Sequence, residues 1–177
     1  MEDRILDICG TTDKLELVLS GGGVRRYHQE SGIHPQPVSE HTWRALAILL
    51  HFWPDISRQV ILVAIYHDIA ERYTGDIPAT VKLNSPELSN ILKDMEVEFM
   101  RFLNLPSEHD LSAVDYHRLK CAEYIELCIT CKAQMGGYSG KRAQQIYERG
   151  MDLVFKFALG LPENEQQPIY NFLRRMP

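Results

Sequence analysis

Apolar side chains recur at helical spacing along almost the whole chain, and this spacing constrains the fold more than any other feature. Segments in which apolar residues return every three or four positions are typical of helices with one buried face. Such segments cover residues 39–53, 55–73, 86–103, 112–134, 141–158 and 163–174, with one or two shorter helices expected within 3–19. We see no convincing strand, so the sequence predicts an all-α fold.

Residues that are typical of helix starts and helix ends separate these segments. Ser39 is a predicted N-cap, Gly136-Gly137 are expected to end the fourth long helix, and Pro168 marks a point where the last helix could begin again. No linker or internal repeat divides the chain. Its 177 residues suit one compact domain over residues 1–177.

Charge and composition exclude several classes of protein. The net charge of -5 is spread without long blocks of one sign, which argues against binding of long nucleic acid but not of mononucleotides. No apolar run reaches the ~20 residues of a membrane span, and the N-terminus lacks a signal-peptide pattern. We interpret the four cysteines as reduced thiols of a cytoplasmic protein, in a bacterium or a phage-infected host cell.

Three ligand-type side chains, His67, Asp68 and Glu71, occur in the most apolar predicted helix. His67 and Glu71 are four residues apart and would share one helix face, with Asp68 beside them. Buried charges are costly unless they pair or bind a metal. Ion pairing within the chain is one interpretation. With a second His from another helix, these donors also suit a divalent cation, which can lower the pKa of bound water.

An ordered series of motifs resembles the HD phosphohydrolase superfamily, which is named for the dipeptide at His67-Asp68. The motifs are Arg26-Tyr27, Val38-Ser39-Glu40-His41, Tyr66-His67-Asp68-Ile69-Ala70-Glu71, Thr74-Gly75-Asp76-Ile77-Pro78 and Val81-Lys82. Together they resemble the 5′-deoxynucleotidase branch. Arg26-Tyr27-His28 in a short chain also resembles phage-type enzymes that include a dATP triphosphohydrolase. The resemblance implies a single HD-domain helical bundle.

The resemblance also implies one divalent metal ion, Co²⁺, Mn²⁺ or Zn²⁺, with Mg²⁺ as a further candidate. His41, His67 and Asp68 would be three of its ligands. The family takes its fourth ligand from an Asp in a Lys-x-Ala-Asp setting, where this chain has Glu123 after Lys120-Cys121-Ala122. Glu123 is therefore the expected fourth ligand, and Asp115 is the alternative.

Two catalytic residues follow from the same resemblance. Glu71 would orient or deprotonate the attacking water or protonate the leaving oxygen, and Arg26 would hold phosphate.

The remaining site residues would bind the nucleotide. Tyr27 stands where the deoxynucleotidases have a Trp against the sugar, and Asp76 matches a residue near the 3′-hydroxyl. Pro78 would pack on the base, and Lys82 would meet the phosphate chain. Asp76 is also typical of a turn, and Lys82 could simply be solvated.

Two reactions on deoxynucleotides fit this pattern. One is hydrolysis of a dNTP, dATP above others, to deoxynucleoside and triphosphate. It is favoured because Arg25, Arg26 and Lys82 supply more cations than a monophosphate needs. The other is release of orthophosphate from a dNMP by a 5′-deoxynucleotidase. A non-catalytic nucleotide-binding HD module is a further alternative, which the Glu at position 123 keeps open.

Relatives form homo-oligomers, and the apolar C-terminal residues could supply an interface or be core: Phe155, Phe157, Phe172 and Leu173.

Overall fold

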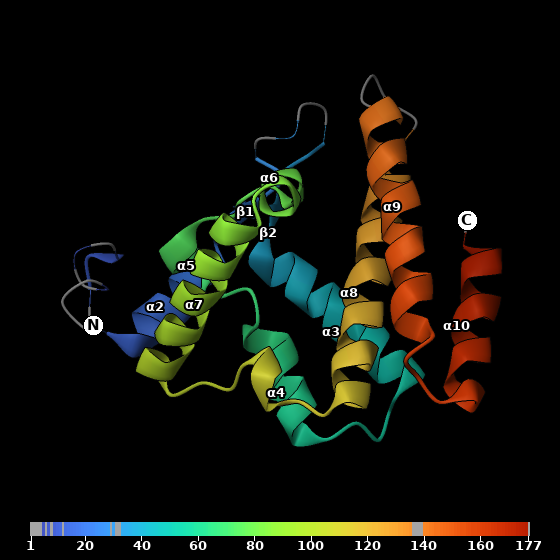
Figure 1. Cartoon of the computed structure of the whole chain (residues 1–177), viewed down its shortest axis with the longest axis horizontal. Helices are drawn as coiled ribbons and strands as arrows, with labels where there is room; N and C mark the ends of the chain where they lie inside the picture. The colour runs from blue at the N-terminus through green and yellow to red at the C-terminus, as the bar shows by residue number, and fades with distance from the viewer. Residues whose placement is uncertain are drawn as a thin grey trace.

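Helices dominate the computed structural model, which describes residues 5, 7, 9–11, 13–28, 30, 33–135 and 140–176 (Figure 1). The helices of eight or more residues are α2 (Lys14–Gly21), α3 (Val38–Phe52), α4 (Arg58–Tyr66), α7 (Pro86–Leu103), α8 (Ala113–Lys132), α9 (Gly140–Ala158) and α10 (Glu163–Arg175). Short helices are α5 (Glu71–Thr74), α6 (Ala79–Asn84) and the 3₁₀ turn η1 (Glu108–Asp110). The prediction of an all-α fold is confirmed.

Polar side chains begin several of these helices. The side chains of Asp13, Ser57 and Ser112 accept a backbone N–H from the first turns of α2, α4 and α8. Each satisfies a donor that has no partner within the helix. Ser39 does not act in this way, because α3 begins one residue earlier, at Val38, with Pro37 at the N-cap.

Two strands of two residues form the only sheet in the described residues. β1 (Arg25–Arg26) pairs antiparallel with β2 (Gln36–Pro37), with Arg26 opposite Gln36. The Val38 N–H donates to the carbonyl of Val24, which continues the pairing into the start of α3. This ladder, which is too short to show strand periodicity in the sequence, holds Arg26 beside the N-terminus of α3.

The predicted helix over residues 55–73 is wrong as one continuous element. α4 ends at Tyr66, residues 67–70 form a turn, and α5 begins at Glu71. The amides of Ile69 and Glu71 bond to carbonyls three residues back, which gives a tighter winding than an α-helix.

The observed ends of the other long helices lie closer to the ends predicted from the apolar spacing. α10 runs through Pro168 without beginning again. The predicted stop at Gly136-Gly137 and part of the predicted helical region 3–19 lie outside the described residues.

Two separate apolar clusters hold the helices together. The first, here called the large core, lies among α3, α4, α8, α9 and α10 and contains Leu49, Val63, Leu119, Ile125, Val154 and Ile169. The second, the small core, lies among α2, α5 and α7 and contains Ile5, Leu17, Ile69, Tyr73, Phe99 and Leu103. Figure 1 shows the two groups of helices on opposite sides of the molecule, joined through α4 and α5.

The C-terminal apolar residues belong mainly to the large core. Leu173 is buried, Phe157 and Phe172 pack against the core, and Phe155 is 43% exposed.

All four cysteines are free and buried, so Cys128 and Cys131 pack as thiols. Burial raises the pKa of Cys128 to about 12. Among the described helices, none has the length and apolar character needed to cross a membrane.

Candidate active site

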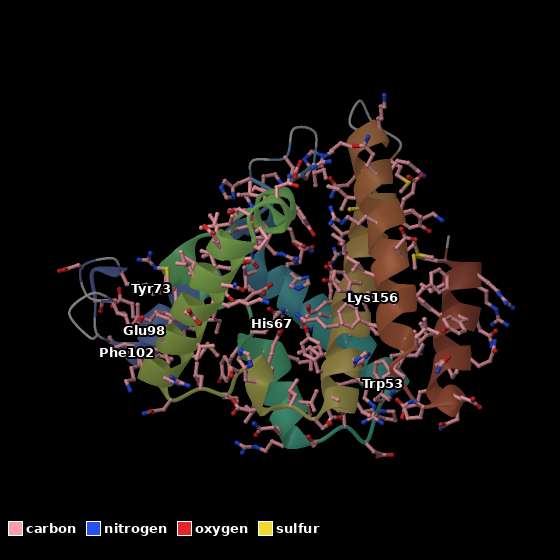
Figure 2. All side chains as sticks on the ribbon, in the orientation of Figure 1. Trp53, His67, Tyr73, Glu98, Phe102 and Lys156 are labelled. Carbon is pink, nitrogen blue, oxygen red and sulfur yellow. The ribbon has the colours of Figure 1, made fainter. Side chains whose placement is uncertain are left out.

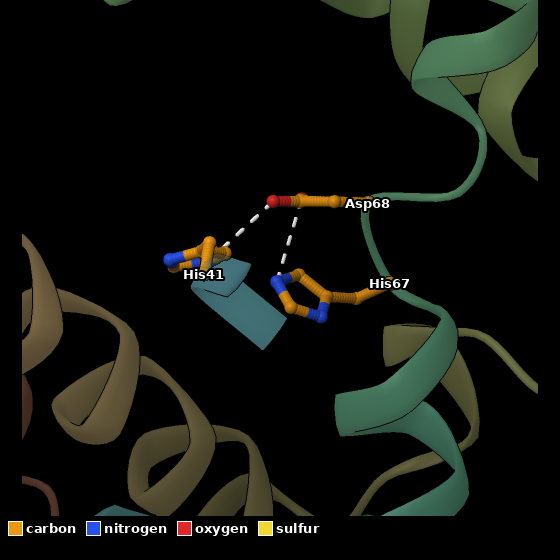
Figure 3. A group of neighbouring side chains, drawn as sticks. All are labelled: His41, His67 and Asp68. Atoms are coloured by element: carbon orange, nitrogen blue, oxygen red, sulfur yellow. Dashed lines mark ion pairs between the residues drawn. The ribbon is translucent and has the colours of Figure 1, made fainter. Parts of the chain in front are cut away.

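His41, His67 and Asp68 meet between the two cores (Figure 3). His41 comes from the first turn of α3, His67 is the C-cap residue that follows α4, and Asp68 comes next in the turn. One donor atom from each lies within 4.8 Å of the others. The Asp68 carboxylate is 3.6 Å from Nε2 of His41 and 3.4 Å from Nε2 of His67. Figure 2 places His67 near the middle of the molecule.

Hydrogen bonds fix which nitrogen of each imidazole is free. Nδ1 of His67 lies 2.9 Å from the carbonyl of Ala64, which can only accept, so Nδ1 carries the proton. Nδ1 of His41 lies 2.7 Å from the Glu126 carboxylate and is a donor in the same way. In the neutral imidazoles, both Nε2 atoms therefore keep a lone pair. Nε2 of His67 is buried without a hydrogen-bond partner, as expected of a metal ligand.

Glu123 on α8 lies next to this group. Its Oε1 is buried, has no hydrogen-bond partner and lies 3.5 Å from Nε2 of His67. Its Oε2 accepts a hydrogen bond of 2.8 Å from Lys120, which also pairs with Glu108. Asp115 instead pairs with Arg118 and Ser112 in the first turn of α8. The structure thus brings Glu123, rather than Asp115, beside the three donors.

The charges around the group act differently on its members. Burial lowers the pKa of His67, but the carboxylates of Asp68 and Glu123 outweigh it and raise that pKa, so a cation bound there would take the place of the Nε2 proton. Burial and the nearby Arg26 lower the pKa of His41, so its imidazole is neutral. Burial opposes ionisation of Asp68, but His67 and Arg26 outweigh it and hold the pKa of this carboxyl below its usual range. A neutral imidazole and an ionised carboxylate are the forms that bind a divalent metal.

Arg26 points its guanidinium into the site from β1. It lies between two carboxylates, with Nε 4.0 Å from Asp68 and Nη1 3.8 Å from Glu126. Burial disfavours its charge, but the neighbouring groups more than compensate and raise its pKa. Nη1 is buried and has no hydrogen-bond partner, so it is available to an anion such as phosphate.

Tyr27 adopts an unusual backbone conformation next to Arg26. Its φ of 62° is in the left-handed region, which a bulky residue rarely adopts without support. The support comes from Asp76, whose carboxylate accepts the Tyr27 N–H at 2.9 Å. The ring then lies 5.3 Å from the Arg26 guanidinium. Asp76 therefore shapes the site by holding Tyr27, in addition to lining it.

Glu71 begins α5, directly after the turn that carries His67 and Asp68. Its Oε2 is buried and has no hydrogen-bond partner. Burial, followed by the charges of Asp68 and Asp76, raises the pKa of Glu71 to about 9. Such a carboxyl can hold a proton at neutral pH and deliver it to a leaving group.

Two hollows meet at these residues, because Asp68, Glu71, Lys82 and Tyr124 line both. The first hollow, here called the Tyr27 hollow, has a volume of about 610 Å³ and is also lined by Arg26, Tyr27, Asp76, Pro78 and residues of α9. The second, the Lys93 hollow, has a volume of about 720 Å³ and is also lined by Lys93, Glu96, Glu108, His109 and Lys120. The structure therefore brings together every predicted site residue except the alternative ligand Asp115.

The sequence analysis assigned no role to two residues that contact the predicted ligands. Glu126 binds His41, and Lys120 binds Glu123. A usable signal was their helical spacing, since both lie three residues from Glu123 and so share its face of α8.

Comparisons with known proteins agree with this geometry. A family model described as 5′-deoxynucleotidase YfbR-like matches residues 22–126, more than half of the chain. A 5′-deoxynucleotidase of Pasteurella multocida is 25% identical over 158 residues, which cover 75% of this chain and 78% of the relative. A 5′-deoxynucleotidase of Vibrio parahaemolyticus is 32% identical over 82 residues, which cover 41% of this chain and 42% of the relative.

A solved structure has the same fold. It is the cyanophage S-2L HD phosphohydrolase DatZ, bound to dA and one catalytic Zn²⁺ ion, with a TM-score of 0.68 and 21% identity. The match covers 91% of this chain and 95% of the phage chain. Fold and site together define a hydrolase of the HD phosphohydrolase type. Within that class, the chain belongs to the YfbR-like 5′-deoxynucleotidase family.

Proposed function

We propose that this chain is a metal-dependent phosphohydrolase that cleaves the bond between O5′ and the adjacent phosphorus of a 2′-deoxynucleotide. The observation that supports this proposal is the group of His41, His67 and Asp68, in which both imidazoles are hydrogen-bonded through Nδ1 and turn Nε2 toward Asp68, beside the Arg26 guanidinium. A divalent cation bound there lowers the pKa of water and supplies a nucleophile near neutral pH. His41, His67, Asp68 and Glu123 would hold it. Mixed imidazole and carboxylate donors suit Zn²⁺, Co²⁺ or Mn²⁺ better than Mg²⁺.

In this proposal, Arg26 and Glu71 act on the reacting phosphate. The free Nη1 of Arg26 donates to a phosphate oxygen and balances the charge that develops there. Glu71 orients the attacking water or protonates the leaving O5′, a role supported by the raised pKa of its buried carboxyl.

The Tyr27 hollow would hold the deoxynucleoside. Its wall combines the Tyr27 ring, the Asp76 carboxylate and Pro78, a set that suits a sugar and a base. The N–H bond to Asp76 fixes Tyr27 in place. A fixed ring against the sugar would disfavour the additional 2′-hydroxyl of a ribonucleotide.

The finer part of the proposal is that a dNTP, dATP above others, is converted to deoxynucleoside and triphosphate. The Lys93 hollow supports it, because this hollow continues from the reacting group away from Tyr27 and carries Lys82 and Lys93, beside Glu96 and Glu108. A chain of phosphates needs such room and cations, and a single phosphate does not. The presence of dA in the phage structure supports adenine as the base.

Release of orthophosphate from a dNMP is the second candidate. It is favoured by the family description and by the names of both bacterial relatives, which are 5′-deoxynucleotidases. In that case Arg26 and Lys82 would bind the single phosphate, and the Lys93 hollow would hold solvent.

Product analysis decides between the two reactions. The protein is incubated with Co²⁺, Mn²⁺, Zn²⁺ or Mg²⁺ and with dATP, dAMP, ATP or AMP, and nucleosides and phosphates are separated. Deoxyadenosine with triphosphate from dATP supports the triphosphohydrolase. Orthophosphate from dAMP, with dATP intact, supports the 5′-deoxynucleotidase. No product from any substrate, although nucleotide binds, would instead indicate a non-catalytic binding module.

A further inference from the structure

Glu126 carries a buried carboxylate directly behind the candidate metal group. It lies on α8, three residues after Glu123, and only 1% of it is exposed. It faces the interior between α8 and the start of α3 and is on the wall of neither hollow. A buried charge in this position needs compensation from its neighbours.

The two carboxylate oxygens of Glu126 contact different partners. Oε1 accepts hydrogen bonds from Gln36 at 2.9 Å and Thr130 at 2.7 Å. Oε2 accepts the Nδ1 proton of His41 at 2.7 Å and faces Arg26 at 3.8 Å. Oε1 is thus anchored on β2 and α8, while Oε2 contacts two groups that line the Tyr27 hollow.

The contact with His41 determines the direction of its imidazole. Because Glu126 accepts the Nδ1 proton, the lone pair of His41 is on Nε2, which lies 3.6 Å from Asp68. A carboxylate behind an imidazole fixes the tautomer and raises the basicity of the donor nitrogen. Without Glu126, the His41 ring could take the other tautomer or rotate.

The contact with Arg26 attracts its guanidinium without using its N–H groups. A separation of 3.8 Å between Nη1 and Oε2 is too long for a hydrogen bond, yet the charges still attract. Nη1 is buried and keeps its donor unpaired. The same carboxylate therefore holds Arg26 beside His41 while leaving it able to bind a phosphate oxygen.

We infer that Glu126 is a positioning residue that fixes His41 as an Nε2 donor and keeps Arg26 beside it. The inference rests on the proposed function, because it assigns Glu126 to the same metal and phosphate site. It requires metal affinity to depend on the Glu126 carboxylate even in the absence of nucleotide.

The test measures metal binding by itself. Metal-free wild-type protein and the Glu126→Gln variant are titrated with Co²⁺, while the visible absorption of the bound ion is recorded. Gln keeps the size of the side chain but removes its charge. We expect the dissociation constant for Co²⁺ to rise roughly 10- to 100-fold, with an altered absorption band that reports a changed ligand geometry.

Two matched variants separate positioning from general stabilisation. Thr130→Val removes one of the two hydrogen bonds that anchor Oε1 of Glu126, so it should weaken Co²⁺ binding by less than Glu126→Gln does. Glu165→Gln removes a hydrogen-bonded carboxylate on α10, which pairs with Arg118 and Trp53, and should keep the wild-type affinity. Thermal unfolding of the metal-free proteins reports the loss of stability in both. A loss of affinity in Glu165→Gln equal to that in Glu126→Gln would overturn the inference.

Glu126→Asp covers the case in which Glu126→Gln fails to fold. Asp keeps the charge but withdraws it by one methylene, so we expect an affinity between those of the wild type and the Gln variant. Wild-type affinity and absorption in the folded variants would overturn the positioning role.

Turnover of dATP and dAMP by the wild type, measured in parallel, tests the proposed function separately. Bound Co²⁺ without any hydrolysis would overturn that function, while the affinity comparison would still decide the role of Glu126.

Discussion

The large core and the small core contribute different groups to the site. His41, Glu123 and Glu126 lie on α3 and α8, helices of 15 and 20 residues that pack in the large core. Glu71 lies on α5, which has only 4 residues and packs in the small core, and Lys82 lies on α6, which has 6. His67 and Asp68 lie at the junction, immediately before the small-core residues Ile69 and Ala70.

This difference follows from what each group must do. Metal donors need fixed mutual distances, which long packed helices provide. Groups that act on the substrate need to approach it from a different direction than the metal donors, and short helices and turns allow this. The candidate metal site therefore depends mainly on the large core, and the proposed acid–base residue Glu71 depends mainly on the small core.

Removing a ligand at the junction should have the largest effect. His67→Ala deletes a buried donor nitrogen that has no hydrogen-bond partner, so the protein should lose its metal. Because a bound cation contributes several kcal/mol to catalysis, hydrolysis should fall by about 1000-fold or more. Metal content by mass spectrometry and product formation measure both effects. His51→Ala, on the exposed last turn of α3, is the control. Unchanged metal stoichiometry in His67→Ala would contradict the assignment.

Glu71→Gln should impair turnover, which we assign to the small core, without impairing metal binding, which we assign to the large core. The variant keeps its size and should bind metal like the wild type, because the proposed donors lie elsewhere. It should lose roughly 10²- to 10⁴-fold in turnover, since an amide cannot transfer a proton. Steady-state kinetics and metal analysis check this together. Glu98→Gln on α7, outside both hollows, is the matched control (Figure 2). Activity retained in Glu71→Gln would remove Glu71 from the mechanism.

Cavities in the two cores should have different functional consequences. Ile125 in the large core and Leu17 in the small core are both fully buried, so each change to Ala should cost about 2–5 kcal/mol of unfolding free energy. Ile125→Ala loosens α8 between Glu123 and Glu126 and should weaken Co²⁺ binding. Leu17→Ala should reduce turnover while keeping Co²⁺ affinity close to the wild type. Urea unfolding and metal titration measure the two properties, and identical profiles would show that the cores act as one.

The smallest effect is expected at the far end of the large core, at Glu165. The hydrogen bonds from Arg118 lower the pKa of Glu165 below its ordinary value. A lowered carboxyl pKa stabilises the fold above the ordinary Glu range near pH 4.3, and this contribution is lost as the pH falls through the lower folded value. Glu165→Gln should therefore cost roughly 0.2–1 kcal/mol at pH 7. The difference in melting temperature between variant and wild type should shrink below about pH 4. A constant difference in melting temperature across this pH range would show that ionised Glu165 does not stabilise the fold.

The sequence predicts the long helices well and their junctions poorly. α3, α7, α9 and α10 each bury a recurring apolar face, and that recurrence is visible in the sequence. α8 lacks such a face, because it also buries Glu123, Glu126 and Thr130. The break after Tyr66 is not visible, because residues 67–70 contain neither Gly nor Pro. α6 was missed because Gly75 and Pro78 suggest only a loop, although Pro78 in fact precedes the first turn of that helix.

The candidate site was predicted residue by residue, but its supporting contacts were not. The resemblance identified His41, His67, Asp68 and Glu123, and the structure places all four together. It gave no information about Glu126, whose partners lie 85 and 90 residues away along the chain at His41 and Gln36. Contacts of that kind depend on how α8 packs against α3, which local patterns do not encode.

The meeting of the two hollows has a kinetic consequence under the proposed function. The Tyr27 hollow is walled by α9 and the loop at residues 76–78, whereas the Lys93 hollow is walled by α7, η1 and the first half of α8. After cleavage of a dNTP, deoxynucleoside and triphosphate would occupy hollows with different outer walls, so neither product would have to wait for the other to leave. Departure would follow a random order, and each product alone would act as a competitive inhibitor of the substrate.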